Sequence, residues 1–234
     1  MSESAVHLQP AFILQHRPYR ETSLLMEVFT RDFGIVPVLA KGVRKEKSKW
    51  AGLLTPFSLL QISYLDKTEL KIFTQAELVS HFPLQKLALY CGFYVNELLQ
   101  AFLHRYDPHS YLFESYQACL VDLMHSQTIE QTLRYFELDL LEETGYGVQL
   151  DSQQLNNQTI QPLQRYNFVA GDGIVADSLG IVSGATLMTL NVKASLTGAA
   201  LNESKLLLRK MLEVHLQGKP LKSRHVLANI IRYL

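Results

Sequence analysis

The sequence predicts a mixed α+β protein that begins with a small closed β-barrel and continues as a mainly helical body with a small β insert. Two changes of pattern support this division. The first 80 residues hold short apolar runs between turn residues, whereas from residue 84 apolar residues recur at three- and four-residue steps. Residues 149–183 are polar and rich in Gln and Asn. We therefore expect four segments, at 1–80, 81–148, 149–183 and 184–234.

Five short strands are expected in the first segment. Turn signals at Arg17-Pro18, Asp32-Phe33-Gly34 and Asp66–Thr68 separate them. About five short strands with Gly, Pro and Asp turns are typical of a small closed barrel. The expected strands lie at Ala11–Leu14, Leu24–Phe29, Ile35–Leu39, Leu59–Leu65 and Leu70–Phe73.

Helices are expected on both sides of the polar insert. Pro108 ends the first, and Gly145 stands where a helix C-terminal glycine belongs. Asn202 is a candidate N-cap, and Gly218 is a stop for the same helix. The expected helices after Pro108 lie at Tyr111–Met124, Glu130–Glu143, 184–191, 202–216 and 222–233. Within the insert, Gly171-Asp172-Gly173 predicts a hairpin turn between Tyr166–Val169 and Ile174–Val175.

Composition favours a folded, cytoplasmic protein. Hydrophobic residues make up 47% of the chain, and neither a signal peptide nor a membrane-length apolar run is present. Cys91 and Cys119 lie in apolar segments, so we expect two reduced core thiols, with a disulfide as the alternative. The formal net charge is zero, but residues 97–151 are acidic whereas residues 203–234 are basic. Local charge decides which surfaces attract a polyanion.

The loop from Lys41 to Trp50 is the most informative stretch, because it carries five cations on a polar segment. Cations spaced in this way track phosphates, and a neighbouring aromatic ring such as Trp50 stacks on an exposed base. The alternative is a solvated charged loop with Trp50 packed against the barrel. The candidate DNA-binding residues are Lys41, Arg44, Lys45, Lys47 and Lys49.

A second basic cluster, Lys219, Lys222 and Arg224, surrounds the expected start of the last helix. A phosphate partner would explain cations near a helix N-terminus; capping of the preceding helix is the alternative for Lys219. Arg134 is the only cation on the acidic helix Glu130–Glu143. It either pairs with a carboxylate of its own helix or captures the carboxylate of a partner.

Catalytic motifs are absent from the sequence. We find no phosphate-binding loop, no dinucleotide-binding glycine motif and no His-Glu-x-x-His, and the eight histidines are scattered. The sequence therefore predicts neither an enzyme nor a cofactor. A nuclease would need clustered metal-binding carboxylates, for which only the acidic helix offers candidates.

Nine short motifs, in order along nearly the whole chain, resemble those of the RecO family of bacterial recombination mediators and DNA repair proteins. They are Ala11-Phe-Ile-Leu, Arg17-Pro-Tyr-Arg-Glu-Thr-Ser-Leu24, Val28-Phe-Thr30, Ala40-Lys-Gly-Val-Arg44, Leu54-Thr-Pro-Phe57, Tyr94-Val-Asn-Glu-Leu-Leu99, Leu133-Arg-Tyr-Phe-Glu-Leu138, Gly145-Tyr-Gly-Val148 and Gly218-Lys-Pro-Leu-Lys-Ser-Arg224.

The resemblance implies an OB-fold N-terminal domain, a helical domain and a zinc-finger-like insert. It implies binding of single- and double-stranded DNA, annealing without ATP, and two partners that help to load RecA: RecR and the acidic C-terminal tail of single-stranded DNA-binding protein. By position, Arg134 matches an arginine that holds this tail, and Lys41 and Arg44 match the basic Lys-Gly-x-Arg loop of the family. Lys219, Lys222 and Arg224 match its C-terminal basic motif. Such a protein would be cytoplasmic and associated with the nucleoid.

Two departures from the family pattern stand out. Some relatives bind zinc through four cysteines, but residues 149–183 contain no cysteine, so no metal is predicted. Relatives often have a second arginine where Tyr135 stands, which weakens the expected capture of an acidic tail. The alternative to a DNA-binding mediator is a protein-interaction adaptor that does not bind DNA and whose basic loop docks on an acidic protein.

Overall fold

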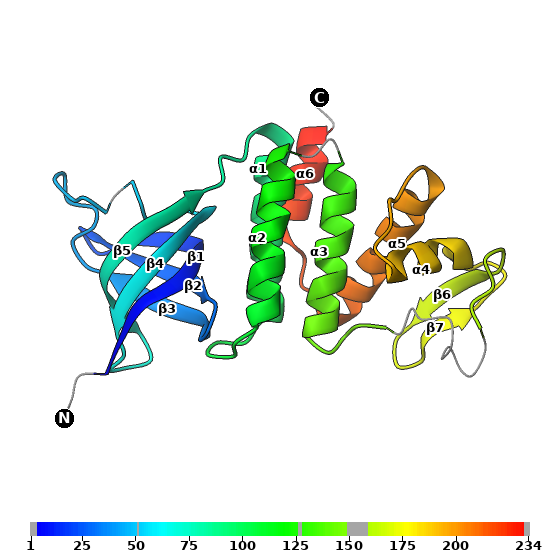
Figure 1. Ribbon diagram of the computed structural model, residues 1–234, viewed down its shortest axis with the longest axis horizontal. Coiled ribbons are helices and arrows are strands. Elements are labelled where there is room, and N and C mark those ends of the chain that lie inside the picture. Colours follow the sequence, from blue (N-terminus) through cyan, green and yellow to red (C-terminus); the bar gives the residue numbers. More distant parts are fainter. Residues whose placement is uncertain (1–3, 51, 126–127, 149–158, 232–234) are drawn as a thin grey trace. The chain divides into compact units, whose positions relative to one another are not determined.

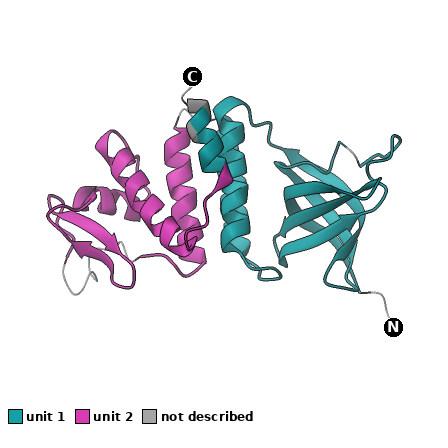
Figure 2. Cartoon of the chain, turned by 180° about the vertical axis from the view of Figure 1, so that it is seen from behind, with its two compact units in different colours: residues 1–125, 223–234 teal, residues 126–222 magenta. Residues whose placement is uncertain are grey.

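A computed structural model describes residues 4–50, 52–125, 128–148 and 159–231 (Figure 1). The chain divides into two compact units, one of Met1–His125 with Ser223–Leu234 and one of Ser126–Lys222 (Figure 2). The predicted mixed α+β architecture, with a five-stranded N-terminal sheet followed by a mainly helical region, is confirmed. The finer division at residues 80, 148 and 183 stays a prediction.

The N-terminal sheet closes on itself. Its strands pair in the order β1-β2-β3-β5-β4, and β1 also pairs with β4. The pairing of β3 with β5 is parallel and the other pairings are antiparallel. A register shift between Ile13 and Gln15 bends β1, which lets one strand serve both neighbours. The strands are β1 (Ala5–Tyr19), β2 (Ser23–Thr30), β3 (Gly34–Ala40), β4 (Ser58–Leu65) and β5 (Lys71–His81).

Alternation of side chains along these strands builds two apolar layers. One layer fills the interior of the closed sheet and includes Ile13, Met26, Val28, Val36, Val38, Leu60 and Ile62. The other layer lies outside the sheet, where Phe12 and Phe29 stand opposite each other in register. Aromatic rings of α2 (Ser110–His125) pack on Phe12 and Phe29 of this second layer.

Two strand predictions were wrong in extent. The expected turn at Arg17-Pro18 lies inside β1, and the chain turns at residues 20–22 instead. Beyond Phe12 the strand pairs only with β2, so a proline without an N–H group is tolerated at its free edge. The last strand was expected to end at Phe73 but continues to His81. Its second half is mostly exposed, so it carries little apolar pattern.

Three helices accompany the sheet in the first unit: α1 (Lys86–Phe102), α2 (Ser110–His125) and α6 (Lys222–Ile231), the last from Ser223 onward. Pro108 lies between α1 and α2, as predicted. The Asn96 amide nitrogen donates to the Leu14 carbonyl at 2.8 Å, and the Tyr116 hydroxyl donates to the Asn96 amide oxygen at 2.6 Å. This buried chain of hydrogen bonds fixes α1 and α2 on β1.

Aromatic rings complete the contact between sheet and helices. The centre of the Phe12 ring lies 5.1 Å from that of Phe113 and 4.8 Å from that of Tyr116. The ring centres of Phe29 and Phe113 lie 5.4 Å apart. Cys91 on α1 and Cys119 on α2 are buried and are not joined in a disulfide, which confirms the two core thiols. Within the described part of the chain, no helix combines the length and apolar character that crossing a membrane requires.

The second unit combines three helices with a small sheet. The sheet order is β7-β6-β8, and the predicted hairpin is confirmed by the pairing of β6 with β7 around Asp172. The third strand has only two residues, too few for a sequence pattern. Residues 149–158 of the predicted insert lie outside the described residues. The elements are α3 (Ile129–Glu143), β6 (Arg165–Val169), β7 (Gly173–Ala176), β8 (Val182–Ser183), α4 (Gly184–Asn191) and α5 (Ala199–His215).

Helix ends in this unit show where capping rules succeeded and failed. Gly145 has φ +79° after α3, and hydrogen bonds from Gly145 N to Glu142 O and from Tyr146 N to Leu141 O close the helix as predicted. The prediction of Asn202 as an N-cap was wrong, because α5 begins at Ala199 and Gly198 is its N-cap. The buried residues of α5 begin only at Ser204, after its first turn.

Candidate nucleic-acid interface

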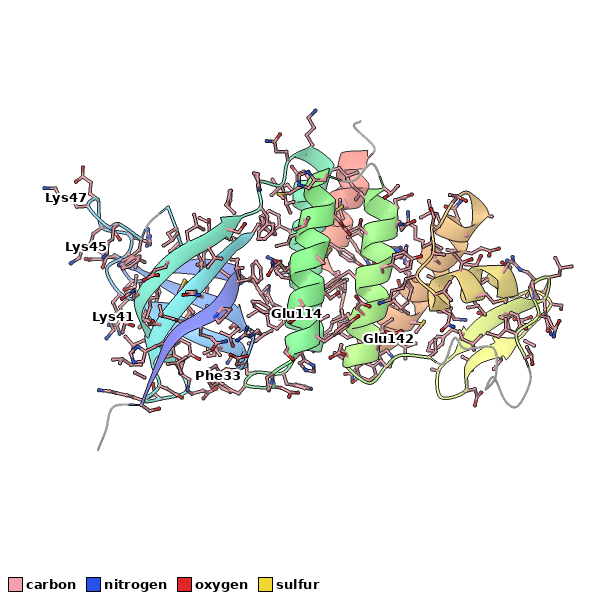
Figure 3. All side chains as sticks on the ribbon, in the orientation of Figure 1. Phe33, Lys41, Lys45, Lys47, Glu114 and Glu142 are labelled. Carbon is pink, nitrogen blue, oxygen red and sulfur yellow. The ribbon has the colours of Figure 1, made fainter. Side chains whose placement is uncertain are left out.

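The basic loop after β3 is anchored on one side and exposed on the other. Val43 is buried in the core of the closed sheet, and Arg44 N donates to the Thr22 carbonyl at 2.9 Å. The predicted cations of the loop are all exposed, and Lys41, Lys45 and Lys47 project from it in Figure 3. A buried valine among exposed lysines therefore holds the loop on the sheet while its charges face solvent.

Two of the loop lysines line a cavity of about 330 Å³ together with the turn between β1 and β2. The turn contributes Tyr19 and Arg20, which sequence reasoning did not select as DNA-binding residues. The Arg20 guanidinium lies 5.4 Å from the centre of the Tyr19 ring. We call this cavity the basic pocket; its lining is Tyr19, Arg20, Thr22, Ser23, Leu39, Lys41, Gly42 and Lys45.

The remaining loop cations have local contacts. The Arg44 guanidinium donates to the Arg20 carbonyl at 3.3 Å, and the Lys49 ammonium lies 4.4 Å from the centre of the Trp50 ring. Trp50 is half-buried and packs edge-on against Phe73 at 5.4 Å, which matches the core alternative left open for this residue. Within the described residues, none of the five cations forms an ion pair with a carboxylate. Their charge is therefore free to attract an anion.

The C-terminal basic cluster is divided between the two units. Lys219 and Lys222 belong to the second unit, whereas Arg224 belongs to the first. Lys219 and Lys222 are exposed, and Lys219 N donates to the Leu216 carbonyl at the end of α5. Arg224 lies over the Tyr94 ring at 5.7 Å, and next to it Ser223 hydrogen-bonds the Glu97 carboxylate. Arg224 therefore also has a structural role against α1.

Arg134 is buried on α3 and pairs with Glu137 one turn later at 2.6 Å. Its side chain is 9% exposed, and that of Glu137 is 1% exposed. The pair within one helix, one of the two alternatives open at the sequence level, is thus formed. The Arg134 Nε atom has no hydrogen-bond partner in the structure. This buried donor has room in its hydrogen bonding for one further acceptor.

Acidic groups dominate the end of the same helix. Burial raises the pKa of Glu142, and the neighbouring Asp139 and Glu143 add to the effect, while Lys193 opposes it. Lys193 also forms an ion pair with Asp139. The Tyr135 hydroxyl donates to the Ala194 carbonyl. Tyr135, which stands where relatives often have a second arginine, is therefore engaged within the unit.

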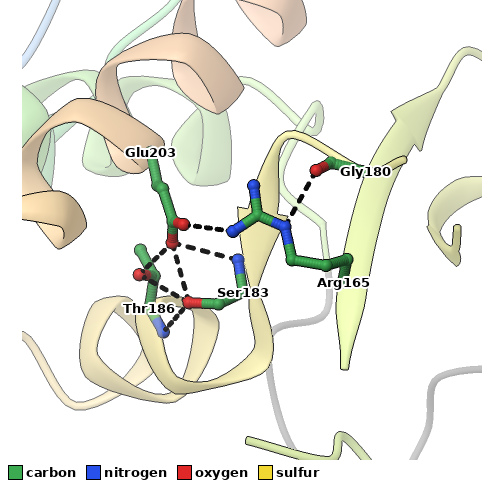
Figure 4. A network of polar contacts seen from close by, with 5 residues as sticks. All are labelled: Arg165, Gly180, Ser183, Thr186 and Glu203. Atoms are coloured by element: carbon green, nitrogen blue, oxygen red, sulfur yellow. Dashed lines mark hydrogen bonds and ion pairs between the residues drawn. The ribbon is translucent and has the colours of Figure 1, made fainter. Parts of the chain in front are cut away.

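A polar network around Glu203, which the sequence did not reveal, joins the small sheet to the helices (Figure 4). The carboxylate accepts hydrogen bonds from Ser183 N at 3.0 Å, from Ser183 Oγ at 2.7 Å and from Thr186 Oγ1 at 2.6 Å. It also pairs with Arg165, whose Nε donates to the Gly180 carbonyl at 3.0 Å. The network ties β6, β8, α4 and α5 to one carboxylate.

The network changes the acidity of Glu203. Partial burial by itself raises the pKa of this carboxyl, but hydrogen bonds from Thr186, Ser183 and Arg165 outweigh burial and lower the pKa to about 2. Among the described residues, no three His, Cys, Asp or Glu side chains gather closely enough to hold a metal ion. The Glu203 network and the buried side chains of Tyr166, Phe168 and Ile174 stabilise the described part of the small sheet.

Comparison with known proteins places these features in a family. The model of the recombination protein O N-terminal region matches residues 1–82, and that of the C-terminal region matches residues 85–225. The chain belongs to the recombination protein O family. The first RecO match covers the closed sheet and the second covers most of the helical region, so the resemblance seen in the sequence motifs is confirmed.

Individual RecO relatives align with almost the whole chain. It is 41% identical over 226 residues to a protein named DNA repair protein RecO from Nitrosospira multiformis, covering 94% of this chain and 93% of the relative. It is 42% identical over 233 residues to the DNA repair protein RecO of Nitrosococcus oceani, covering 97% and 95%. For the protein of the same name from Methylococcus capsulatus the identity is 40% over 226 residues, covering 95% and 93%.

Proposed function

We propose that the protein is a mediator of recombinational DNA repair that binds single- and double-stranded DNA. The observation that carries this proposal is the basic pocket, where Arg20, Lys41 and Lys45 converge without a carboxylate partner among the described residues. Release of counterions from a phosphate backbone favours binding at such a site. The closed sheet would then act as an OB-fold, whose connecting loops commonly hold nucleic acid.

Annealing of complementary strands is the proposed action, and it needs no ATP and no chemical step. Positive charge reduces the repulsion between two strands, while bases that remain accessible can pair. The exposed cations of the basic loop, together with Lys219, Lys222 and Arg224, are the proposed source of this charge. A role on DNA would place the protein at the nucleoid.

Two partner proteins belong to the proposal, RecR and single-stranded DNA-binding protein, with which the protein would promote RecA loading. We propose that Arg134 holds the acidic C-terminal tail of the second partner. The unpartnered Nε donor of Arg134 supports this assignment. Because Glu137 already occupies one guanidinium nitrogen, the tail must bind beside this carboxylate or displace it.

Strand annealing tests the proposed function directly. Two complementary oligonucleotides coated with the cognate single-stranded DNA-binding protein are mixed with this protein in the absence of ATP, and duplex formation is followed by fluorescence. We expect rapid annealing. Arg134→Lys, which keeps the charge but loses the fork, should slow annealing of coated strands and leave annealing of naked strands unchanged. Equal slowing of both reactions would contradict the assignment of Arg134.

The basic loop has its own test. Lys45→Glu and Lys47→Glu, each alone, should weaken binding of a naked oligonucleotide. The slope of the logarithm of the binding constant against the logarithm of the salt concentration should become shallower by roughly 0.7 per lost contact on single strands. Lys205→Glu is the matched control, because Lys205 is an exposed lysine on α5 in the other unit. Affinity and salt slope equal to those of the control would remove the loop from the interface.

A protein-interaction adaptor that does not bind DNA is the second candidate. It is favoured by the contacts that Arg44, Lys49 and Arg224 already make within the chain, which reduce the number of unengaged cations. Titration of naked oligonucleotide at low salt separates the two candidates. Salt-dependent binding supports the mediator, and absence of binding supports the adaptor.

A further inference from the structure

A second cavity, which we call the neutral cleft, lies in the first unit outside the closed sheet. Its volume is about 600 Å³, within the roughly 300–1,000 Å³ of small-molecule sites. The strands β1, β2 and β3 form one wall, and the turn between β4 and β5 and the end of α1 form the others. Its lining includes Gln15, Leu25, Pro37, Gln100, Leu103 and Arg105.

The end of α1 is fixed against the sheet, so this wall of the cleft is well defined. Tyr106 N donates to the Ile35 carbonyl at 3.1 Å, and the backbones of Arg105 and Ile35 form an isolated parallel β-bridge. Gly34, with φ +64°, allows the chain to approach this closely, because a Cβ atom there would collide with the backbone of Asp107. Contacts within the chain itself therefore form this wall of the cleft.

The charges that line the cleft balance. Arg105 pairs with Glu27 at 2.7 Å and lies 3.8 Å from Glu69, and Arg17 stands exposed at the same cavity. Two arginines face two glutamates, so the formal charge of the lining is zero. A phosphate group would meet carboxylates here, whereas an uncharged ligand avoids that cost.

The neutral cleft adjoins the basic pocket on the same face of the sheet. Leu25, which lines the cleft, stands directly opposite Leu39, which lines the basic pocket, in the register of β2 and β3. Neighbouring strands lie about 4.8 Å apart. A ligand that places an anion in the basic pocket therefore reaches the neutral cleft with an adjacent uncharged group.

We propose that the neutral cleft receives one unpaired nucleobase of a strand whose phosphates occupy the basic pocket, an inference that rests on the proposed DNA binding. Leu25, Pro37 and Leu103 offer apolar contact to the faces of the ring. The side-chain amides of Gln15 and Gln100 each supply donor and acceptor capacity for its polar edge. The Gln100 amide nitrogen donates to the Asn96 carbonyl at 3.3 Å, which leaves its oxygen as an acceptor.

This assignment makes single-stranded DNA the preferred ligand of the face. A base in a duplex is stacked and paired, and both interactions must be broken to move it into the cleft. An unpaired base has no base pair to break, so its transfer into the cleft costs less free energy. Amides that both donate and accept do not select one base, so the cleft accepts any sequence.

Replacing both cleft amides tests the proposal. Gln15→Leu with Gln100→Leu keeps size and charge but removes the polar groups. We expect the affinity for a single-stranded oligonucleotide to fall roughly tenfold, with the affinity for duplex and the salt slope unchanged. Gln61→Leu with Gln75→Leu is the matched control, because these glutamines lie on β4 and β5, away from the cleft lining. Fluorescence of an oligonucleotide containing 2-aminopurine reports directly on the environment of the base.

The outcomes separate the two proposals. If the wild-type chain binds no oligonucleotide, the proposed function fails and the cleft assignment fails with it. If the wild type binds but the cleft variant matches the control, only the cleft assignment is overturned. Equal loss of single-stranded and duplex affinity would also overturn it, because the amides would then not act on an unpaired base.

Discussion

The two sheets of the molecule are held in place by different means. In the closed N-terminal sheet every residue of β3 is buried. Aromatic rings and the buried amide of Asn96 connect this sheet to α1 and α2. The three-stranded sheet of the second unit has one strand of two residues and is tied to its helices through the carboxylate of Glu203.

The contrast teaches how sheet size decides the kind of stabilisation. Five strands that close on themselves enclose an interior, so apolar burial of roughly 25 cal/mol per Å² accumulates over many residues. Three short strands enclose nothing and bury only a few side chains, such as Tyr166, Phe168 and Ile174. The Glu203 carboxylate accepts from four donor groups, and these bonds fix the orientation of the strands and helices, which such a small core does not fix. The following substitutions test this difference.

The largest effect is expected in the closed sheet. Phe12 is fully buried between sheet and helices, so Phe12→Ala should lower the free energy of unfolding by roughly 3–5 kcal/mol through lost contacts and a cavity. Urea denaturation followed by circular dichroism measures it. Phe33→Ala, at an exposed turn residue labelled in Figure 3, should change stability by less than about 0.5 kcal/mol. Similar losses in both variants would show that the aromatic layer is not the main contact.

The second effect concerns the small sheet. Glu203→Gln keeps the shape of the side chain but weakens hydrogen bonds to a charged acceptor, which are worth roughly 1.5–3 kcal/mol. Faster hydrogen exchange should appear in β6 and β8 and leave the closed sheet unchanged. Glu213→Gln on the same helix is the control, because this carboxylate is half-exposed in its pair with Arg209. Unchanged exchange in β6 and β8 would contradict the role of the network.

A third effect follows from pH. The folded-state pKa of Glu203 is about 2, below its ordinary value of 4.5. A depressed carboxyl pKa contributes stability that is present above the ordinary value and is lost as the pH falls towards the folded value. Protection of β6 and β8 should therefore decrease between about pH 5 and about pH 3. The same acidification of the Glu203→Gln variant should change their protection less, and an identical change would argue against this carboxyl as the source.

The smallest effect isolates one donor of the network. Ser183 caps α4 by accepting from Thr186 N and also donates to Glu203, so Ser183→Ala should cost about 1 kcal/mol. Ser178→Ala, at an exposed turn residue of the same sheet, is the neutral control. Thermal denaturation of both variants gives the difference. A loss as large as that of Glu203→Gln would mean that Ser183, and not the carboxylate, organises the junction.

The fold was predictable where local rules act alone. Apolar runs located β2, β3 and β4 to within one residue at each end, and the glycine after α3 marked the end of that helix. The second half of β5 was missed because its pairing with β4, and not an apolar pattern, decides it. The start of α5 was missed because the buried residues of this helix begin only at Ser204. The two-residue β8 exists only because it pairs with β6.

The site was predictable only in part. The cations of the basic loop could be recognised because they are adjacent in sequence. Arg20 could not be recognised, because it lies about twenty positions before the basic loop in the sequence. It reaches the pocket only through the pairing of β1 with β2. The Glu203 network joins residues from four elements, and neither Arg165 nor Glu203 is unusual by itself. Spatial convergence of ordinary residues leaves no local trace in a sequence.

The return of the chain at Ser223 has a consequence for synthesis. The first unit is completed by α6, where Ser223 and Arg224 contact Glu97 and Tyr94 of α1. The ribosome makes α1 first and α6 only after the whole second unit. The first unit therefore lacks α6 against α1 until the whole second unit has been synthesised. Domains generally fold as units in the order of their synthesis; here the unit that begins first is the one that finishes last.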